Sequence, residues 1–175
     1  MNVFVLCGGR CGSVTFAKAC SHITNFTSGH ETKAGKYGAE HFQYAENHIE
    51  VDNRLSWFLG MLDECYGDRA YYVHLVRDSN EVAASFMKRW GLGIISAYRG
   101  AMIQRSSMVE DKGIVLDYCE TVGSNIRLFL KDKTKKLDIR LEEVKVRFPI
   151  FWKEIGAEGD LGKAIKEFDI RYNRS

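Results

Sequence analysis

The chain has 175 residues, a length typical of one domain, and 45% of them are apolar, which is enough for a buried core. A single proline and a formal net charge of +2 argue against a disordered chain and against a protein built to bind long nucleic acids. No apolar stretch has the length of a membrane span. The five cysteines are scattered without a CxxC pair, which favours reduced thiols over disulfides or a zinc site. We therefore expect one cytoplasmic domain over residues 1–175, without a membrane or nucleic acid partner.

The first part of the chain has the pattern of a strand, a glycine turn and a helix. Residues 3–7 are a short apolar run that two glycines follow at once, which is typical of a buried parallel strand. A helix is predicted over residues 13–22 and a second strand over residues 23–26. Residues 27–43 contain three glycines and no clear period, so a long loop is predicted there.

The middle of the chain repeats the alternation of strands and helices. Residues 49–52 form a predicted strand, after which Asp52 or Asn53 is expected to cap a helix that ends near residue 66. The clearest strand covers residues 70–76. Asp78 and Glu81 then form a capping-box pattern at the start of another helix.

The remaining elements complete an α/β pattern. A short helix is predicted within the loop 91–107, followed by a long helix over residues 113–131 and a last strand over residues 137–141. Three helical pieces close the chain, over residues 142–147, 149–155 and 161–168. Pro149 would suit the first position of its helix. Strands that alternate with helices imply a parallel sheet. We expect a three-layer α/β/α domain with a small parallel sheet of about four or five strands flanked by helices.

The stretch from Cys7 to Ser13, here called the glycine loop, joins the first strand to the first helix. Anions bind at such junctions because glycines let backbone N–H groups approach them and the helix N-terminus adds a positive dipole end. A nucleoside triphosphatase loop would end in a lysine before the hydroxyl residue, but Gly12 precedes Ser13 directly. Lys18 lies too far into the helix to replace that lysine. The alternative interpretation is a tight glycine turn without a ligand.

A second motif links the end of the clearest strand to the helix that follows. Arg77 closes the strand, and Ser85 lies on the second turn of the helix. An arginine offers a charged fork to a phosphate, and a serine adds a hydroxyl group. Arg89 lies on the same helix face as Ser85, so it is expected nearby. Alternatively, Arg77 and Asp78 pair or cap the helix while Ser85 is a small packing residue.

The two motifs, in this order, resemble the nucleotide-binding segments of sulfotransferases that use the sulfate donor PAPS (3′-phosphoadenosine 5′-phosphosulfate). Arg10, Gly12 and Ser13 match the family's 5′-phosphosulfate loop, while Arg77 and Ser85 match its 3′-phosphate segment. The resemblance implies a P-loop-type fold and an enzyme that transfers a sulfuryl group from PAPS to a hydroxyl of a small molecule or sugar. It also implies release of PAP without a metal ion.

The resemblance extends clearly over residues 3–22 and 70–90 and faintly over residues 140–143. It implies that the residues that bind the donor are Gly9, Arg10, Cys11, Gly12, Ser13, Val14, Arg77 and Ser85. Arg10 is also the candidate for stabilising the charge that develops on the leaving phosphate. Val14 stands where many family members have a hydroxyl residue.

A sulfotransferase needs a base for the acceptor hydroxyl, and the candidates follow the predicted second strand. Sulfotransferases of the heparan type place a catalytic glutamate at a similar point, so the resemblance gives the role to Glu31. His30 is the second candidate and His41 the third. A polar loop residue without a role is the alternative for each. No further histidine follows at helical spacing, so no metal site is predicted.

The C-terminal part departs from the family pattern. Only Gly159, Gly162 and Lys163 are similar to the glycine-rich, basic segment that closes over the 3′-phosphate in the family. The site is therefore expected to be more open, or to be completed by the loop 91–113, the C-terminus or a second copy in a homo-oligomer. Two other functions stay open: a protein that binds PAP or PAPS without turnover, and a divergent P-loop kinase.

Overall fold

A five-stranded parallel sheet organises the chain in the computed structural model, which describes residues 1–105, 110–170 and 172. The strands lie in the order β2-β3-β1-β4-β5, and each neighbouring pair is parallel. Their bounds are β1 (Val3–Leu6), β2 (Thr27–His30), β3 (His48–Val51), β4 (Tyr71–Val76) and β5 (Lys136–Arg140). The predicted α/β class with a small parallel sheet is confirmed.

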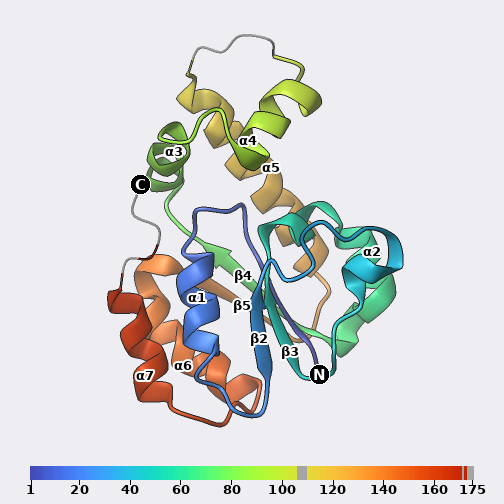
Figure 1. Ribbon diagram of the computed structural model, residues 1–175, viewed down its shortest axis with the longest axis vertical. Helices are drawn as coiled ribbons and strands as arrows, with labels where there is room; N and C mark the ends of the chain where they lie inside the picture. The colour runs from blue at the N-terminus through green and yellow to red at the C-terminus, as the bar shows by residue number, and fades with distance from the viewer. Residues whose placement is uncertain (106–109, 171, 173–175) are drawn as a thin grey trace.

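Helices cover both faces of this sheet, as two neighbouring residues of β4 show. The ring of Tyr71 packs against Phe151 on one face, and the ring of Tyr72 packs against Phe129 on the other. Successive side chains of a strand point to opposite faces, so these contacts define two helical layers. One layer contains α1 (Ser13–Cys20), α6 (Val144–Glu154) and α7 (Leu161–Lys166), and the other contains α2 (Leu59–Tyr66) and α5 (Lys112–Leu130) (Figure 1).

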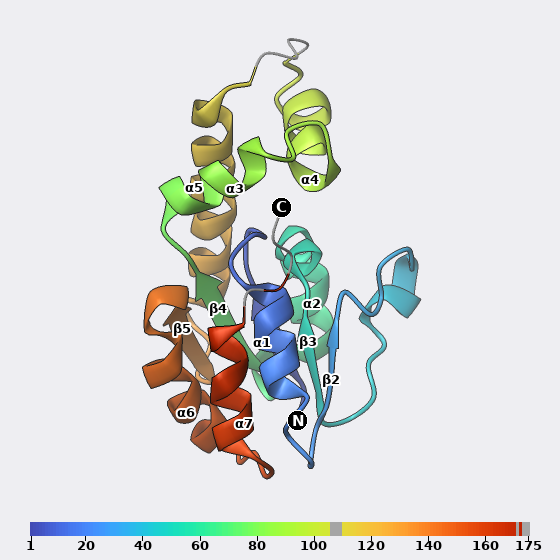
Figure 2. The same ribbon diagram turned by 60° about the vertical axis from the view of Figure 1, so that its left-hand side comes forward.

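Further helical turns stand above the carboxyl ends of the strands. They are α3 (Ser79–Met87), α4 (Gly93–Ala97) and the π-helical turn η4 (Tyr98–Met102), which rise beside the upper part of α5 (Figure 2). The short helix predicted within the loop 91–107 is thus confirmed, although residues 106 and 107 lie outside the described residues. Among the described residues, none of the helices combines the length and the apolar character that crossing a membrane requires.

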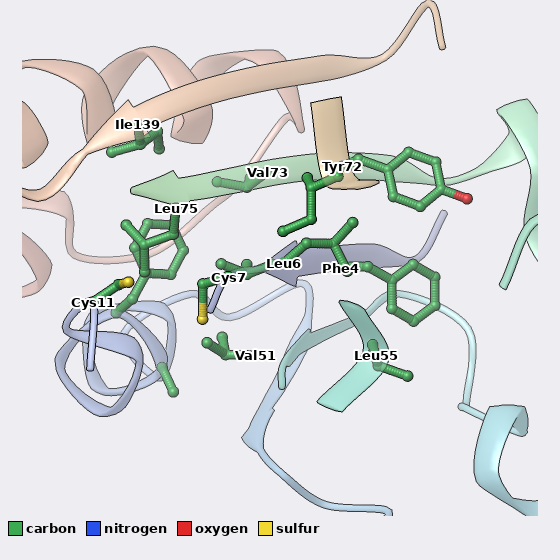
Figure 3. Close-up of a cluster of buried hydrophobic side chains, with 14 of the residues drawn as sticks. Phe4, Leu6, Cys7, Cys11, Val51, Leu55, Tyr72, Val73, Leu75 and Ile139 are labelled. Atoms are coloured by element: carbon green, nitrogen blue, oxygen red, sulfur yellow. The ribbon is translucent and has the colours of Figure 1, made fainter. Parts of the chain in front are cut away.

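The core is built around β1, the strand that carries the glycine loop. All four of its residues are fully buried. Figure 3 shows Phe4 and Leu6 of β1 among apolar side chains from the neighbouring strands, with the thiols of Cys7 and Cys11 at the edge of the same cluster. Full burial of one such aliphatic or aromatic side chain contributes about 1.5–3 kcal/mol. The loop therefore begins from the most constrained part of the sheet.

Two predicted elements in the first half have different positions in the structure. The second strand covers Thr27–His30 rather than residues 23–26, and Ile23 makes only an isolated antiparallel bridge to Gly159. As an edge strand whose side chains are half-buried or exposed, β2 lacks the apolar run that marks a buried strand. The prediction of a loop over residues 27–43 is therefore wrong for its first four residues.

Two helix boundaries also differ from the prediction. Asp52 does cap a helix, accepting the amide of Arg54 at 2.7 Å, but this is the short 3₁₀ helix η2 (Asn53–Trp57), and α2 begins only after Phe58. Pro149 lies inside α6 rather than at its start. Phe148, Phe151 and Trp152 are buried along that helix, and their packing outweighs the hydrogen bond that the proline cannot make.

Candidate functional site

A cavity of about 540 Å³ lies where β1 and β4 end. The glycine loop leads from β1 to α1 on one face of the sheet, while β4 leads to α3, which packs against α5 above the other face. Ligands of open α/β sheets bind at such a divergence. The cavity brings together six of the predicted donor-binding residues: Arg10, Gly12, Ser13, Val14, Arg77 and Ser85. Gly9 and Cys11 belong to the same loop but do not line the cavity.

Glycine is required in the loop for both conformation and space. Gly9 and Gly12 have φ angles of 85° and 82°, in the left-handed region that favours glycine. At Gly12, a Cβ atom would also stand 2.7 Å from Cδ1 of Leu141. Arg10 adopts φ 58° without being a glycine. A left-handed residue of this kind costs about 1–2 kcal/mol, so other contacts must hold Arg10 in place.

Four successive carbonyl groups of the loop accept hydrogen bonds from side chains. Ser56 Oγ donates to the carbonyl of Cys7 at 3.0 Å, and Tyr118 Oη donates to that of Gly8 at 2.7 Å. Cys11 Sγ donates to the carbonyl of Gly9 at 3.1 Å, and Arg77 Nη1 donates to that of Arg10 at 3.2 Å. These donors come from η2, α5, the loop itself and the residue after β4. The backbone of the loop is thus held by several distant parts of the chain.

Most amide groups of the same loop have no backbone partner. The backbone of Gly8 is hydrogen-bonded to the Cys11 thiol, whereas none of the N–H groups of residues 9–12 donates to a backbone carbonyl of a described residue. The amide of Gly9 belongs to the same peptide as the carbonyl of Gly8, and a trans peptide points its two polar groups in opposite directions. With four carbonyls held by the protein, the amides of Arg10 and Gly12 at the cavity remain available to an anion, as in anion-binding loops.

Direct contacts link the two sequence motifs. Nε of Arg10 donates to Oγ of Ser85 at 2.8 Å, although the two residues are 75 positions apart. Arg77 reaches the loop through its bond to the Arg10 carbonyl and also pairs with Glu81 at 3.1 Å. Asp78 caps α3 by accepting the amides of Asn80 and Glu81. Half of the predicted capping box is present, because Glu81 turns to Arg77 instead of returning to the cap.

The electrostatics of the cavity favour an anion. Burial lowers the pKa of Arg10, and the positive charges of Arg89 and Arg77 lower it further. Lys88 also lines the cavity. Cations held near one another repel, and a bound anion would relieve that repulsion. Arg89 was expected near Ser85 from its helical spacing, and its effect on Arg10 is consistent with that prediction.

One wall of the cavity is apolar and comes largely from the C-terminal part of the chain. It contains Leu141, Val144, Phe168, Ile170 and Tyr172. Tyr172 donates its hydroxyl to Glu167. The predicted segment around Gly159 and Lys163 does not line the cavity, since Gly159 packs on the backbone of His22 and Lys163 pairs with Asp160.

The motif comparison missed several lining residues, and one of them had a signal in the sequence. Thr15 lines the cavity one position after Val14, the position at which the sulfotransferase pattern often has a hydroxyl residue. Lys88 follows Ser85 on the next turn of α3. The apolar residues of the C-terminal wall carry no recognisable motif, because contacts of this kind depend on how the last helices pack.

The two base candidates lie at the end of β2 and have different partners. His30 Nε2 and Ser13 Oγ are 3.0 Å apart, so His30 contacts the first residue of α1. Glu31, with φ 53°, instead forms an ion pair with Arg54 at 2.5 Å. Neither residue lines the cavity. His41 is buried and bonded to the Lys36 carbonyl. Of these three side chains, His30 alone contacts a cavity residue.

Two fully buried carboxyl groups lie on β3 and just beyond it, beside these candidates. Glu50 accepts hydrogen bonds from His48 and Thr32, and these bonds hold its pKa below the ordinary value although burial alone would raise it. Burial raises the pKa of Asp52, against the opposing hydrogen bond from the Arg54 amide. Oδ2 of Asp52 has no partner among the described residues. The pKa values of the two carboxyl groups are therefore shifted in opposite directions.

Comparison of the chain with family models, with curated proteins and with solved structures finds no match. Support for a function therefore comes from the contacts and charges of this cavity. They favour an anionic ligand that has at least one apolar part.

Proposed function

We propose that the chain is a sulfotransferase that moves a sulfuryl group from PAPS to an acceptor hydroxyl and releases PAP. The observation that carries this proposal is the contact between Arg10 and Ser85 across one cavity. Arg10 belongs to the segment that resembles a 5′-phosphosulfate loop, and Ser85 belongs to the segment that resembles a 3′-phosphate site. One nucleotide with an anionic group at each end would engage both segments.

The size and lining of the cavity are compatible with such a ligand. A volume of about 540 Å³ lies within the range of small-molecule sites. The loop amides, Arg10 and Arg77 would hold the anionic groups, and the wall that contains Phe168 and Tyr172 would pack against the nucleobase. Sulfotransferase motifs together with this polarity favour a phosphorylated sulfate donor over a simple inorganic anion.

The proposed reaction is a direct transfer. The acceptor oxygen forms a bond to sulfur while the bond between sulfur and the bridging oxygen breaks, and that electron pair stays on the 5′-phosphate. Arg10 and the loop amides stabilise the charge on the leaving phosphate. Removing one such oriented donor typically lowers the rate about a hundredfold or more. In this scheme the chain's cations act where an ATP-dependent enzyme uses Mg²⁺.

We assign the base to His30 rather than to Glu31. The acceptor hydroxyl must lose a proton to a group that reaches the anion end of the cavity, and His30 contacts Ser13 there. The carboxylate of Glu31 is engaged by Arg54. Glu31 remains the alternative base, and a variant test below separates the two.

The first test is thermal stabilisation by PAP, ADP and ATP, each measured without and with Mg²⁺. A ligand at about one hundred times its dissociation constant adds roughly 2.7 kcal/mol to the free energy of unfolding. We expect a metal-independent shift with PAP, a smaller one with ADP, and loss of the PAP shift in Arg77→Ala. Arg127→Ala is the control, because Arg127 is also paired with a glutamate, Glu120, but lies exposed on α5 outside the cavity.

The other functions predict different results. A kinase would be stabilised best by ATP with Mg²⁺, and that outcome would overturn the proposal. A protein that binds PAP without turnover would show the PAP shift but no transfer of labelled sulfuryl groups from PAPS to a panel of phenols and sugars. Equal thermal stabilisation by PAP, ADP and ATP would indicate a general phosphate site.

A further inference from the structure

The orientation of the glycine loop depends on two side chains that do not line the cavity. Tyr118 of α5 is fully buried, and its hydroxyl donates to the Gly8 carbonyl at 2.7 Å. Ser56 of η2 is 3% exposed and donates to the Cys7 carbonyl at 3.0 Å. Both residues lie outside the two sequence motifs.

Because the peptide group is planar, a hydrogen bond to its carbonyl also restrains its N–H group. The carbonyls of Cys7 and Gly8 share their peptides with the N–H groups of Gly8 and Gly9. A donor that fixes a carbonyl therefore also fixes the orientation of the N–H group in the same peptide. Gly9 has φ 85° and no Cβ atom, so its two peptides would otherwise rotate with little steric restraint.

The surroundings of Tyr118 make it a rigid donor. Its ring packs against Phe86, Tyr98 and Trp57, with centroids 5.3–6.1 Å apart. Burial raises the pKa of its hydroxyl, which therefore remains protonated as a donor at neutral pH. A Cβ atom at Gly8 would stand 3.6 Å from Cε1 of this ring, so the ring also lies directly against the loop.

We propose that Tyr118 and Ser56 are positioning residues of the anion site: they fix the Cys7 and Gly8 peptides, from which the loop runs to Arg10 and Gly12 at the cavity, without touching the ligand. The inference rests on the proposed function only in that the loop must bind an anion. It holds for any phosphate or sulfate group there, whatever reaction follows.

The test compares two Tyr→Phe variants that lose the same kind of bond. Tyr118→Phe removes the hydroxyl that holds Gly8. Tyr72→Phe removes an equally buried hydroxyl that donates to the Gly67 carbonyl at 2.8 Å, at the far end of the sheet. Dissociation constants for PAP and for inorganic phosphate are measured by calorimetry, together with the free energy of unfolding of each variant.

We expect Tyr118→Phe to raise the dissociation constant for PAP about three- to tenfold, the value of one hydrogen bond, and Tyr72→Phe to leave it unchanged. Ser56→Ala should act in the same direction as Tyr118→Phe. Both tyrosine variants should lose similar stability, so a general structural effect would not separate them. Amide exchange at Gly8 and Gly9 should become faster in Tyr118→Phe alone.

Three results would overturn the inference. One is an unchanged dissociation constant in both Tyr118→Phe and Ser56→Ala, and another is an equal rise in Tyr118→Phe and Tyr72→Phe. If the wild type binds phosphate but not PAP, the donor proposal fails, and the phosphate constants still decide the roles of Tyr118 and Ser56. If the wild type binds neither, both proposals fail.

Discussion

Nε of Arg10 and Oγ of Ser85 are already joined by a 2.8 Å hydrogen bond across the cavity. The loop and α3 are therefore held at a fixed separation without a bound ligand. Such preorganisation lowers the ordering cost of binding. Ser85 orients Arg10, and under the proposed function it would also contact the 3′-phosphate of the nucleotide.

Ser85→Ala tests this double role. We expect the dissociation constant for PAP to rise about three- to tenfold, because the variant loses a hydrogen bond to a charged group. Binding of ADP, which lacks the 3′-phosphate, should change less. Calorimetric titration of both nucleotides measures the difference. Ser79→Ala, on the exposed start of the same helix, should leave both constants unchanged, and equal losses for PAP and ADP would contradict a 3′-phosphate role.

Gly12→Ala is expected to disrupt the site more than its backbone angle alone would explain. Gly35 has nearly the same φ, 80° against 82°, but no atom lies within 4 Å of a Cβ placed there. Gly35→Ala should therefore cost about 1 kcal/mol of stability. Gly12→Ala should cost at least about 1 kcal/mol more, because its Cβ overlaps Leu141, and should abolish the PAP shift.

Urea denaturation of the two alanine variants measures this comparison. Adding Leu141→Ala to Gly12→Ala makes room for the new methyl group and should recover part of the PAP shift. Equal losses of stability in Gly12→Ala and Gly35→Ala would show that Leu141 moves aside without a cost in the free energy of unfolding.

The base assignment predicts different outcomes for two neighbouring residues. His30→Gln should lower kcat about a hundredfold or more while leaving the dissociation constant for PAP nearly unchanged. Glu31→Gln should have a much smaller effect on kcat. Steady-state rates with the best acceptor of the panel, with PAP binding as the control, decide between them. The reverse pattern would return the role to Glu31.

The two buried carboxyl groups predict opposite pH dependences of stability. The pKa of Asp52 is raised, so its contribution is fully present below the ordinary aspartate pKa and is lost as the pH rises through the folded value. The advantage of Asp52→Asn over the wild type in the free energy of unfolding should therefore grow as the pH rises from 4 through the folded pKa of Asp52. The pKa of Glu50 is lowered, so Glu50→Gln should be less stable at pH 8, with a deficit that shrinks as the pH falls.

Urea denaturation at several pH values measures both differences. The wild type serves as the reference at each pH, which removes the effects of the other titrating groups. A pH-independent difference for Asp52→Asn would show that the folded and unfolded chains bind this proton equally.

The parts of the sheet and of the cavity that depend on local sequence patterns could be predicted. The buried run that forms β1, the glycine loop after it, and the pair Arg77 and Ser85 all follow from neighbouring residues. The edge strand β2 could not be found in this way, because its four residues are half-buried or exposed. Its place is set by pairing with β3 along the register from Thr27 to His30.

Side chains that act from a distance were the least predictable part of the site. Tyr118 has the spacing of an ordinary core residue of α5, and nothing in its neighbours indicates a bond to Gly8. Pro149 suggested a helix start, but the packing of α6 carries the helix through it. In both cases the decisive contacts join segments that are far apart in the sequence or depend on tertiary packing.

The segment after β5 closes the site from the far end of the chain. Leu141 rests against Gly12, and Glu142 accepts the amide of Asp78 at 3.2 Å. A nascent chain that has emerged from the ribosome only through α5 therefore carries both motifs but lacks the residues that brace them. Because domains mature as synthesis proceeds, binding of the proposed nucleotide would require that β5 has docked, and translation pauses before residue 141 would leave the loop without its support.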